Sequence, residues 1–386
     1  MASDPISRRD SPRSCAARWS SSASSPTGGT SACASAARIT NPLDNRASAR
    51  QRSRPSAYRP IGSRARGTDP SLMRIYFCSD LHGSRKCWKK FLNAGNFYEA
   101  DCIIVGGDIT GKFVVPLVEA PKGRRRATFL GIDREVEGED LARLRTWIED
   151  AGQYWVELTP EEVAYYESDQ TRIDALFRTL VLQRVRGWID EADAKLRTSG
   201  VRVMVSGAND DFIEVDEEIA RSAVIEDPNG RVVELGDGFS IMGMGWGNPT
   251  PWACPRDISE DELAAKIDAV GEGLDDPSRT VFSLHVPPFG TDLDLAPKLD
   301  DYLRPRVNAS GLEMIPVGST AVRDAIVRYR PLIGLHGHIH ESKGIRKLEG
   351  VIIANPGSEY GEGILDGVIV DLDRRKGVTD VRLVAG

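Results

Sequence analysis

Short apolar runs alternate with helical patterns from residue 74 onward. Residues 74–78 and 102–105 are apolar and predict two buried strands, and Ser84 can cap a helix that continues to about Asn93. A strand, a helix and a strand within such a short stretch are typical of a βαβ unit, so the pattern predicts an α/β fold. Open α/β sheets bind ligands at the edge where their strands end.

Residues 112–200 predict mainly helix, after a short β-like pair at 113–118 and 127–131. Thr159 and Glu162 form a capping-box pattern that starts one of these helices. We therefore expect a helical insertion at about 112–200. The rest of the chain predicts strands at 201–205, 232–235, 239–244, 281–284 and 332–335, helices from Ser259 and over 320–330, and a β-meander in the tail at 350–354, 367–372 and 379–384.

Charge divides the chain of 386 residues into two parts. Residues 1–72 contain twelve Arg, four Asp, no Lys and no Glu, so their net charge is +8. Because the net charge of the whole chain is −7, the remaining residues carry −15. Sixteen of these 72 residues are Ser, and no apolar period is present, which predicts a disordered leader. We expect translation to begin at Met73, with an organelle transit peptide as the alternative, and one domain over 73–386.

Composition also limits the partners and the compartment. The uncharged stretches 19–37 and 238–255 are rich in Ser or broken by Gly and Pro, so neither predicts a membrane span and no membrane partner is expected. The six cysteines form no CxxC pair, which favours a reducing, cytoplasmic location. The charge of −15 on the predicted domain argues against a nucleic-acid partner.

The candidate chemistry lies where predicted strands end, and it includes all five histidines of the chain. Imidazoles combined with Asp and Asn oxygens are typical ligands of Mn, Fe or Zn. Two ions about 3.5–4 Å apart need a shared carboxylate, and Asp108 is the candidate for it. The clusters are Asp80/His82, Asp108, Asn209/Asp210, His285 and His336/His338/His340.

These clusters resemble, in order, the five motifs of the calcineurin-like metallophosphoesterase family, over about residues 73–358. The resemblance implies an α-β-β-α sandwich with two central mixed sheets, as in metallo-dependent phosphatases. It also implies two divalent metal ions, Mn²⁺ first, with Fe, Zn or Mg as alternatives. The implied ligands are Asp80, His82, Asp108 and His340 for one ion, and Asp108, Asn209, His285 and His338 for the other; the motifs are Asp80-x-His82, Gly107-Asp108, Asn209-Asp210, His285 and Gly337-His338-x-His340.

The third motif departs from the family pattern. Family members commonly have Gly-Asn-His there, whereas this chain has Ala208-Asn209-Asp210 and so resembles a prokaryotic branch that lacks the histidine. Members of that kind tend to favour phosphodiesters, and an acid at this position repels a dianionic monoester more than a monoanionic diester. A register with Ala208 at the Asn position would leave one ion a ligand short, so Asn209 is preferred. Asp210 is expected to orient water or substrate.

The expected function is hydrolysis of a small phosphodiester by a metal-held hydroxide, with Asp108 and Asp210 as the candidate catalytic residues. A phosphomonoesterase, a nuclease and a non-enzymatic interaction scaffold remain as alternatives, and the oligomeric state is open. The family pattern gives His336 no role as a metal ligand, so we expect this histidine to be structural. Arg85 and the run 124–126 are more simply solvated than substrate contacts, and the stretches 245–251 and 355–358 are expected to shape the mouth of the site.

Overall fold

The computed structural model describes residues 18–19, 72–309 and 311–386. The predicted disordered leader, 1–72, lies outside these residues except for Leu72 and for Arg18–Trp19, which form strand β1. Strand β1 pairs in parallel with the start of β4 (Phe113–Glu119). Within the described ranges, no helix is long and apolar enough to cross a membrane.

Two six-stranded mixed sheets form the centre of the molecule. Their facing surfaces share one core, to which Phe77 and Ile104 contribute from the first sheet and Val281 from the second. The first sheet has the order β21 (Gly377–Ala385), β20 (Asp366–Asp373), β2 (Leu72–Cys78), β3 (Cys102–Val105), β8 (Arg202–Val205) and β9 (Ile225–Glu226). The second has the order β10 (Val232–Gly236), β11 (Phe239–Met244), β12 (Thr280–Leu284), β17 (Ile333–Leu335), β19 (Val351–Asn355) and β18 (Gly344–Leu348).

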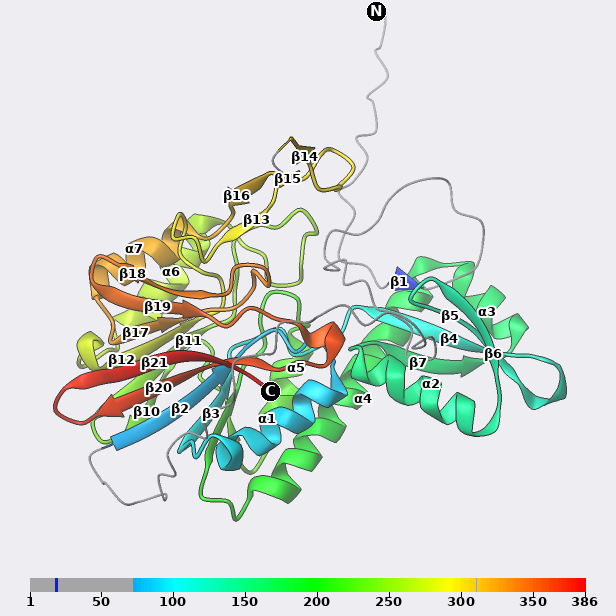
Figure 1. Ribbon diagram of the computed structural model, residues 1–386, viewed down its shortest axis with the longest axis horizontal. Coiled ribbons are helices and arrows are strands. Elements are labelled where there is room, and N and C mark those ends of the chain that lie inside the picture. The colour runs from blue at the N-terminus through cyan, green and yellow to red at the C-terminus, as the bar shows by residue number, and fades with distance from the viewer. Residues whose placement is uncertain (1–17, 20–71, 310) are drawn as a thin grey trace, which may run out of the picture.

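Helices cover the outer faces of both sheets (Figure 1). The first sheet packs against α1 (Arg85–Phe97), α4 (Gln170–Leu196) and α5 (Glu214–Ile219), where Trp88 and Trp188 stack with their ring centroids 4.8 Å apart. The second sheet packs against α6 (Glu260–Gly271) and α7 (Thr320–Tyr329). The predicted α-β-β-α sandwich is therefore confirmed. Short 3-10 turns occur at Pro121–Gly123, Pro277–Arg279 and Tyr360–Glu362.

The segment predicted as a helical insertion contains a sheet as well as helices; its last helix, α4, packs on the first sheet, and the rest lies to one side of the sandwich (Figure 1). The predicted β-like pair becomes β4 and β5, whereas β6 and β7 were not predicted from the sequence. Strand β6 is rich in charged residues and none of its side chains is fully buried, so its sequence lacks the alternation of apolar and polar residues that predicts a strand. The elements are β4, β5 (Arg125–Phe129), β6 (Ile132–Val136), β7 (Tyr154–Leu158), α2 (Gly138–Asp150) and α3 (Pro160–Glu167).

Two further departures from the sequence prediction concern the second half of the chain. The predicted β-meander of the tail is wrong, because β19 joins the second sheet whereas β20 and β21 form a hairpin in the first. Apolar runs identify strands but not the sheet that they enter.

Two small strand pairs form an arm that projects beyond the second sheet (Figure 1). The arm comprises β13 (Leu295–Pro297), β14 (Val307–Asn308), β15 (Gly311–Leu312) and β16 (Met314–Pro316).

Candidate metal centre

The predicted clusters all follow the carboxyl ends of parallel strands, as expected. Strands β2, β3 and β8 are parallel in the first sheet, and β11, β12, β17 and β19 are parallel in the second. Because the two sheets face each other, the loops after these strands meet at one end of the sandwich. Asp80 and His82 follow β2, Asp108 follows β3, Asn209 and Asp210 follow β8, His285 follows β12, and His336, His338 and His340 follow β17.

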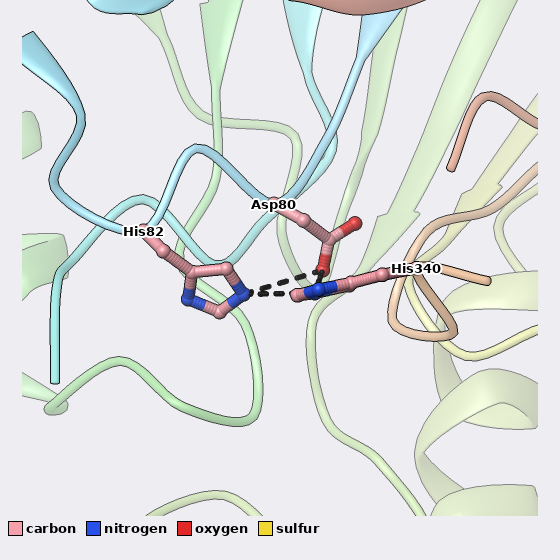
Figure 2. A group of neighbouring side chains, drawn as sticks. All are labelled: Asp80, His82 and His340. Atoms are coloured by element: carbon pink, nitrogen blue, oxygen red, sulfur yellow. Dashed lines mark hydrogen bonds and ion pairs between the residues drawn. The ribbon is translucent and has the colours of Figure 1, made fainter. Parts of the chain in front are cut away.

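Asp80, His82 and His340 form one convergent group (Figure 2). The Nε2 atoms of His82 and His340 lie 3.0 Å apart, and the Oδ1 atom of Asp80 lies 3.8 Å and 3.4 Å from them. The other ring nitrogen of His82, Nδ1, lies 3.3 Å from the carbonyl oxygen of Thr110. When Nδ1 donates its proton to that oxygen, Nε2 carries a lone pair directed at the centre of the group.

Asp108, His285 and His338 form a second group beside the first. The Nε2 atom of His285 lies 3.4 Å from Asp108 Oδ2 and 3.8 Å from Asp80 Oδ1, so the two groups are contiguous. Asp108 Oδ2 also lies 3.8 Å from His82 Nε2, which makes this carboxylate common to both groups. The Oδ1 atom of Asn209 lies 3.0 Å from His338 Nδ1.

The donor set fits divalent cations. Among the described residues, His285 Nε2 is buried and has no hydrogen-bond partner, although it faces two carboxylates. Burial lowers the pKa of His285, but the charges of Asp108 and Asp80 outweigh burial and raise this pKa to about 9. The carboxylates thus strongly favour positive charge at this point. A divalent cation supplies that charge, and imidazole and carboxylate are suitable ligands for it.

Two of the other imidazoles are held in the neutral form that ligates metals. Burial, followed by the charge of Lys112, lowers the pKa of His82 to about 3. Burial and the charge of His285 lower the pKa of His338 to about 4. Neutral imidazole retains the lone pair that a metal requires, so a proton does not compete at these nitrogens near neutral pH.

The backbone around the site is locally strained. Asp80, His82, Asp108 and His338 all have positive φ angles, of 58°, 42°, 50° and 67°. Such left-handed conformations are uncommon outside glycine and gather at functional sites. The glycine at 107 is also required by packing, since a Cβ atom there would lie 2.3 Å from the Cβ atom of Ala208. The loops of the site therefore adopt backbone conformations that are energetically unfavourable.

Buried polar side chains fix the loops that carry these residues. Asp211 accepts hydrogen bonds from the backbone of Ile109, Thr110 and Ala208, and so ties the loop after β3 to the loop after β8. The 355–358 stretch was expected at the mouth of the site, but it does not line the pocket and instead holds the loops: Asn355 Nδ2 donates to the carbonyl oxygens of Gly337 and Ile339, and Ser358 Oγ donates to that of Asp80. The role of Asp211 was not predicted from the sequence.

Asp210 forms an ion pair with Lys112. The Sγ atom of Cys254 donates to Asp210 Oδ1 at 2.8 Å, and the backbone nitrogen of Asp210 donates to Asp108 Oδ1 at 3.1 Å. Burial raises the pKa of Asp210, but the interactions with Lys112, His82 and Cys254 together outweigh burial and hold this pKa well below its usual range. The sequence prediction missed Lys112, although its position four residues after Asp108 places it in the same loop.

The remaining sequence candidates lie away from the two groups. His336 is fully buried, its Nδ1 atom lies 2.7 Å from the carbonyl oxygen of Leu284, and it belongs to neither group. Arg85 pairs with Glu149 and Asp150 of α2, which ties the insertion to α1. The arginines of the 124–126 run pair with acidic residues of the insertion, Glu135 and Glu157.

A pocket of about 660 Å³ opens beside the two groups. Asp108, Asn209, His338 and His340 line it, as do Asp210 and Lys112, and residues of the 245–251 stretch form part of its wall. This volume is within the range of roughly 300–1,000 Å³ that is typical of sites for small molecules. The arrangement thus places a candidate metal centre, a cation and a pocket for an organic group side by side.

No family model matches the chain. An uncharacterized protein of Methanocaldococcus jannaschii is 30% identical over 129 residues, which are 33% of this chain and 51% of the relative, so the chain spans about half the length of this relative. A crystal structure from Thermus thermophilus is 12% identical with a TM-score of 0.44, covering 82% of this chain and 98% of that chain. An archaeal phosphodiesterase is 12% identical with a TM-score of 0.28, covering 81% and 100%.

Proposed function

We propose that this protein is a dinuclear metal-dependent phosphoesterase that prefers phosphodiesters, and that it belongs to the branch of calcineurin-like metallophosphoesterases without the histidine of the third motif. The observation that carries the proposal is the convergence of two ligand groups on shared carboxylates. Paired metal ions with a common carboxylate ligand are typical of enzymes that transfer phosphoryl groups to water.

The proposed ligands follow from these contacts. Asp80, His82 and His340 hold one ion, Asn209, His285 and His338 hold the other, and Asp108 contributes to both. When bound, the two ions activate water and neutralise the charge that develops on the phosphate oxygens. Mn²⁺ is the preferred ion because the set mixes imidazole with carboxylate and amide oxygens, and Fe, Zn and Mg are the alternatives.

Lys112 and Asp210 have a separate task in this proposal. The ammonium group of Lys112 lines the pocket beside Asp108, and Asp210 holds it there. A cation at this position binds a phosphate oxygen of the substrate and stabilises the charge of the transition state. Asp210 acts as a positioning residue for Lys112, which refines the expectation that it orients substrate.

Two features favour a diester over a monoester. The charge of Asp210 offsets that of Lys112, so this pair adds no net positive charge to balance the second negative charge that a monoester would bring and a diester would not. The pocket also provides space for a second organic group next to the phosphate. A small diester therefore fits the site better than a monoester, and the charge of −15 on residues 73–386 disfavours a nucleic acid.

The proposal is tested with bis(p-nitrophenyl) phosphate and p-nitrophenyl phosphate as substrates for the full chain in Mn²⁺. We expect kcat/KM for the diester to exceed that for the monoester by about tenfold or more, since one extra charge repelled in a partly buried site is worth at least about 1.4 kcal/mol. A reversed ratio would identify a phosphomonoesterase. Hydrolysis of DNA that falls steeply with salt, with no turnover of small diesters, would identify a nuclease instead.

A further inference from the structure

The pocket beside the candidate metal centre has two apolar walls. One is formed by the loop after β11, through Pro249, Pro251 and Trp252. The other is formed by the projecting arm and the residue directly after β16, through Leu299, Ile315 and Val317. Four candidate ligands, Asp108, Asn209, His338 and His340, line the same pocket, so a group that extends from a bound phosphate can contact these apolar residues.

The polar side chains in the walls are mostly occupied by the protein itself. Thr250 Oγ1 donates to Asp257 Oδ2 at 2.6 Å, and Asn248 Nδ2 donates to the carbonyl oxygen of Val317 at 3.3 Å. Lys298 pairs with Glu313 of the same arm at 2.7 Å. Within these walls, the amide oxygen of Asn248 is a buried acceptor without a hydrogen-bond partner. These walls therefore offer little hydrogen bonding to a sugar or a nucleobase, and they favour an apolar group.

The apolar character continues outward along the arm. Tyr302 is 75% exposed, Val307 is 74% exposed and Leu312 is 53% exposed. Val307 and Leu312 are paired across β14 and β15, and neighbouring exposed apolar side chains are typical of surfaces that meet an apolar ligand or a lipid. The arm projects beyond the second sheet in Figure 1, and Leu299 and Ile315 of this segment line the pocket, so an alkyl group longer than the pocket would meet the rest of the arm.

We propose that the substrate of this site is a lipid-like phosphodiester in which one ester group is a long alkyl chain. The phosphate lies at the candidate metal centre, and the chain lies between the 249–252 loop and the arm, with its far end toward the exposed arm residues. The inference rests on the proposed phosphodiesterase function and adds the chemical class of the organic group to it.

A series of p-nitrophenyl alkyl phosphodiesters with methyl, butyl and octyl groups tests the substrate class. The chromophore that leaves is the same in each, so differences in rate report on the alkyl group alone. Below the micelle concentration of each ester, with the full chain in Mn²⁺, we expect kcat/KM to rise about twofold to fourfold for each methylene buried and to be at least about thirtyfold higher for octyl than for methyl.

Three outcomes distinguish this inference from the function on which it rests. A rate that is flat or falls with alkyl length would overturn the alkyl assignment while leaving the phosphodiesterase intact. Faster hydrolysis of the p-nitrophenyl ester of thymidine 5′-phosphate than of the octyl ester would also overturn it, in favour of a nucleotide-type group. Absence of turnover with every diester, including bis(p-nitrophenyl) phosphate, would contradict the proposed function itself.

Variants of the pocket walls test whether the alkyl group of the substrate binds in this pocket. Trp252→Ala and Ile315→Ala, one from each wall, are each expected to lower the octyl-to-methyl ratio of kcat/KM by about fivefold to tenfold, through lost apolar contact. Val327→Ala is the matched control, because Val327 is an exposed apolar residue of α7 that does not line the pocket, and its ratio should match the wild type. If the wall variants left the octyl-to-methyl ratio unchanged, the alkyl group would not occupy this pocket and the proposal would be wrong.

Discussion

Replacement of Asp108 by Asn is expected to abolish hydrolysis of bis(p-nitrophenyl) phosphate in Mn²⁺, with kcat reduced by more than about a hundredfold, the upper range for losing even an outer partner of a metal ligand. Asp108 lies within 4 Å of both His82 and His285, so its carboxylate serves both groups. The amide is neutral and is a poorer bridge between two cations. Initial rates over a range of Mn²⁺ concentrations measure the effect.

The control for Asp108→Asn is Asp275→Asn, because Asp275 is exposed and is absent from both ligand groups. Its rate should equal that of the wild type. Unchanged turnover of Asp108→Asn, in a protein that melts at the wild-type temperature, would refute the shared-ligand role. Restoration of the rate by high Mn²⁺ would point to weakened affinity rather than to a lost bridge.

Replacement of Lys112 by Met is the second large effect that we expect, with kcat/KM lowered by about 10- to 150-fold. A charge-assisted hydrogen bond to a phosphate oxygen contributes roughly 1.5–3 kcal/mol, which corresponds to this range. Lys112→Arg should recover part of the loss, because arginine also carries the charge. The measurement is kcat and KM for bis(p-nitrophenyl) phosphate, together with the manganese content of each variant.

Metal content separates the two possible reasons for a defect in Lys112→Met. If Lys112 contacts the substrate, the variant keeps its metal and loses rate. If the residue only organises the loop, metal is lost along with the rate, and Lys112→Arg rescues neither. Lys376→Met serves as the control, since Lys376 lies in the exposed turn between β20 and β21.

The sequence predicts where the strand-end residues of this centre lie, because two simple rules decide their placement. Apolar runs mark strands, and parallel strands of facing sheets end at the same edge, so Asp80, Asp108 and His285 had to approach each other once the α/β pattern was recognised. The positions of all the predicted ligands agree with that expectation. Their roles as ligands stay predictions until a bound metal is measured.

Other features depend on contacts that a single sequence does not reveal. The partnership of Lys112 with Asp210 and Cys254 requires the loop after β3 to meet two distant segments. The sheet of the insertion and the assignment of β19 to the second sheet are likewise long-range pairings. Side-chain periodicity identifies a buried face, but it carries no information about the element that covers it.

The most direct test of the account is the number of metal ions bound by each chain. The purified full-length protein is stripped with a chelator, loaded with Mn²⁺, freed of excess ion by gel filtration and measured by inductively coupled plasma mass spectrometry. We predict two Mn²⁺ ions per chain, and fewer in Asp108→Asn. A wild-type protein that binds one ion would contradict the dinuclear centre, and one that binds none and hydrolyses no phosphoester would leave the fold as a non-enzymatic scaffold.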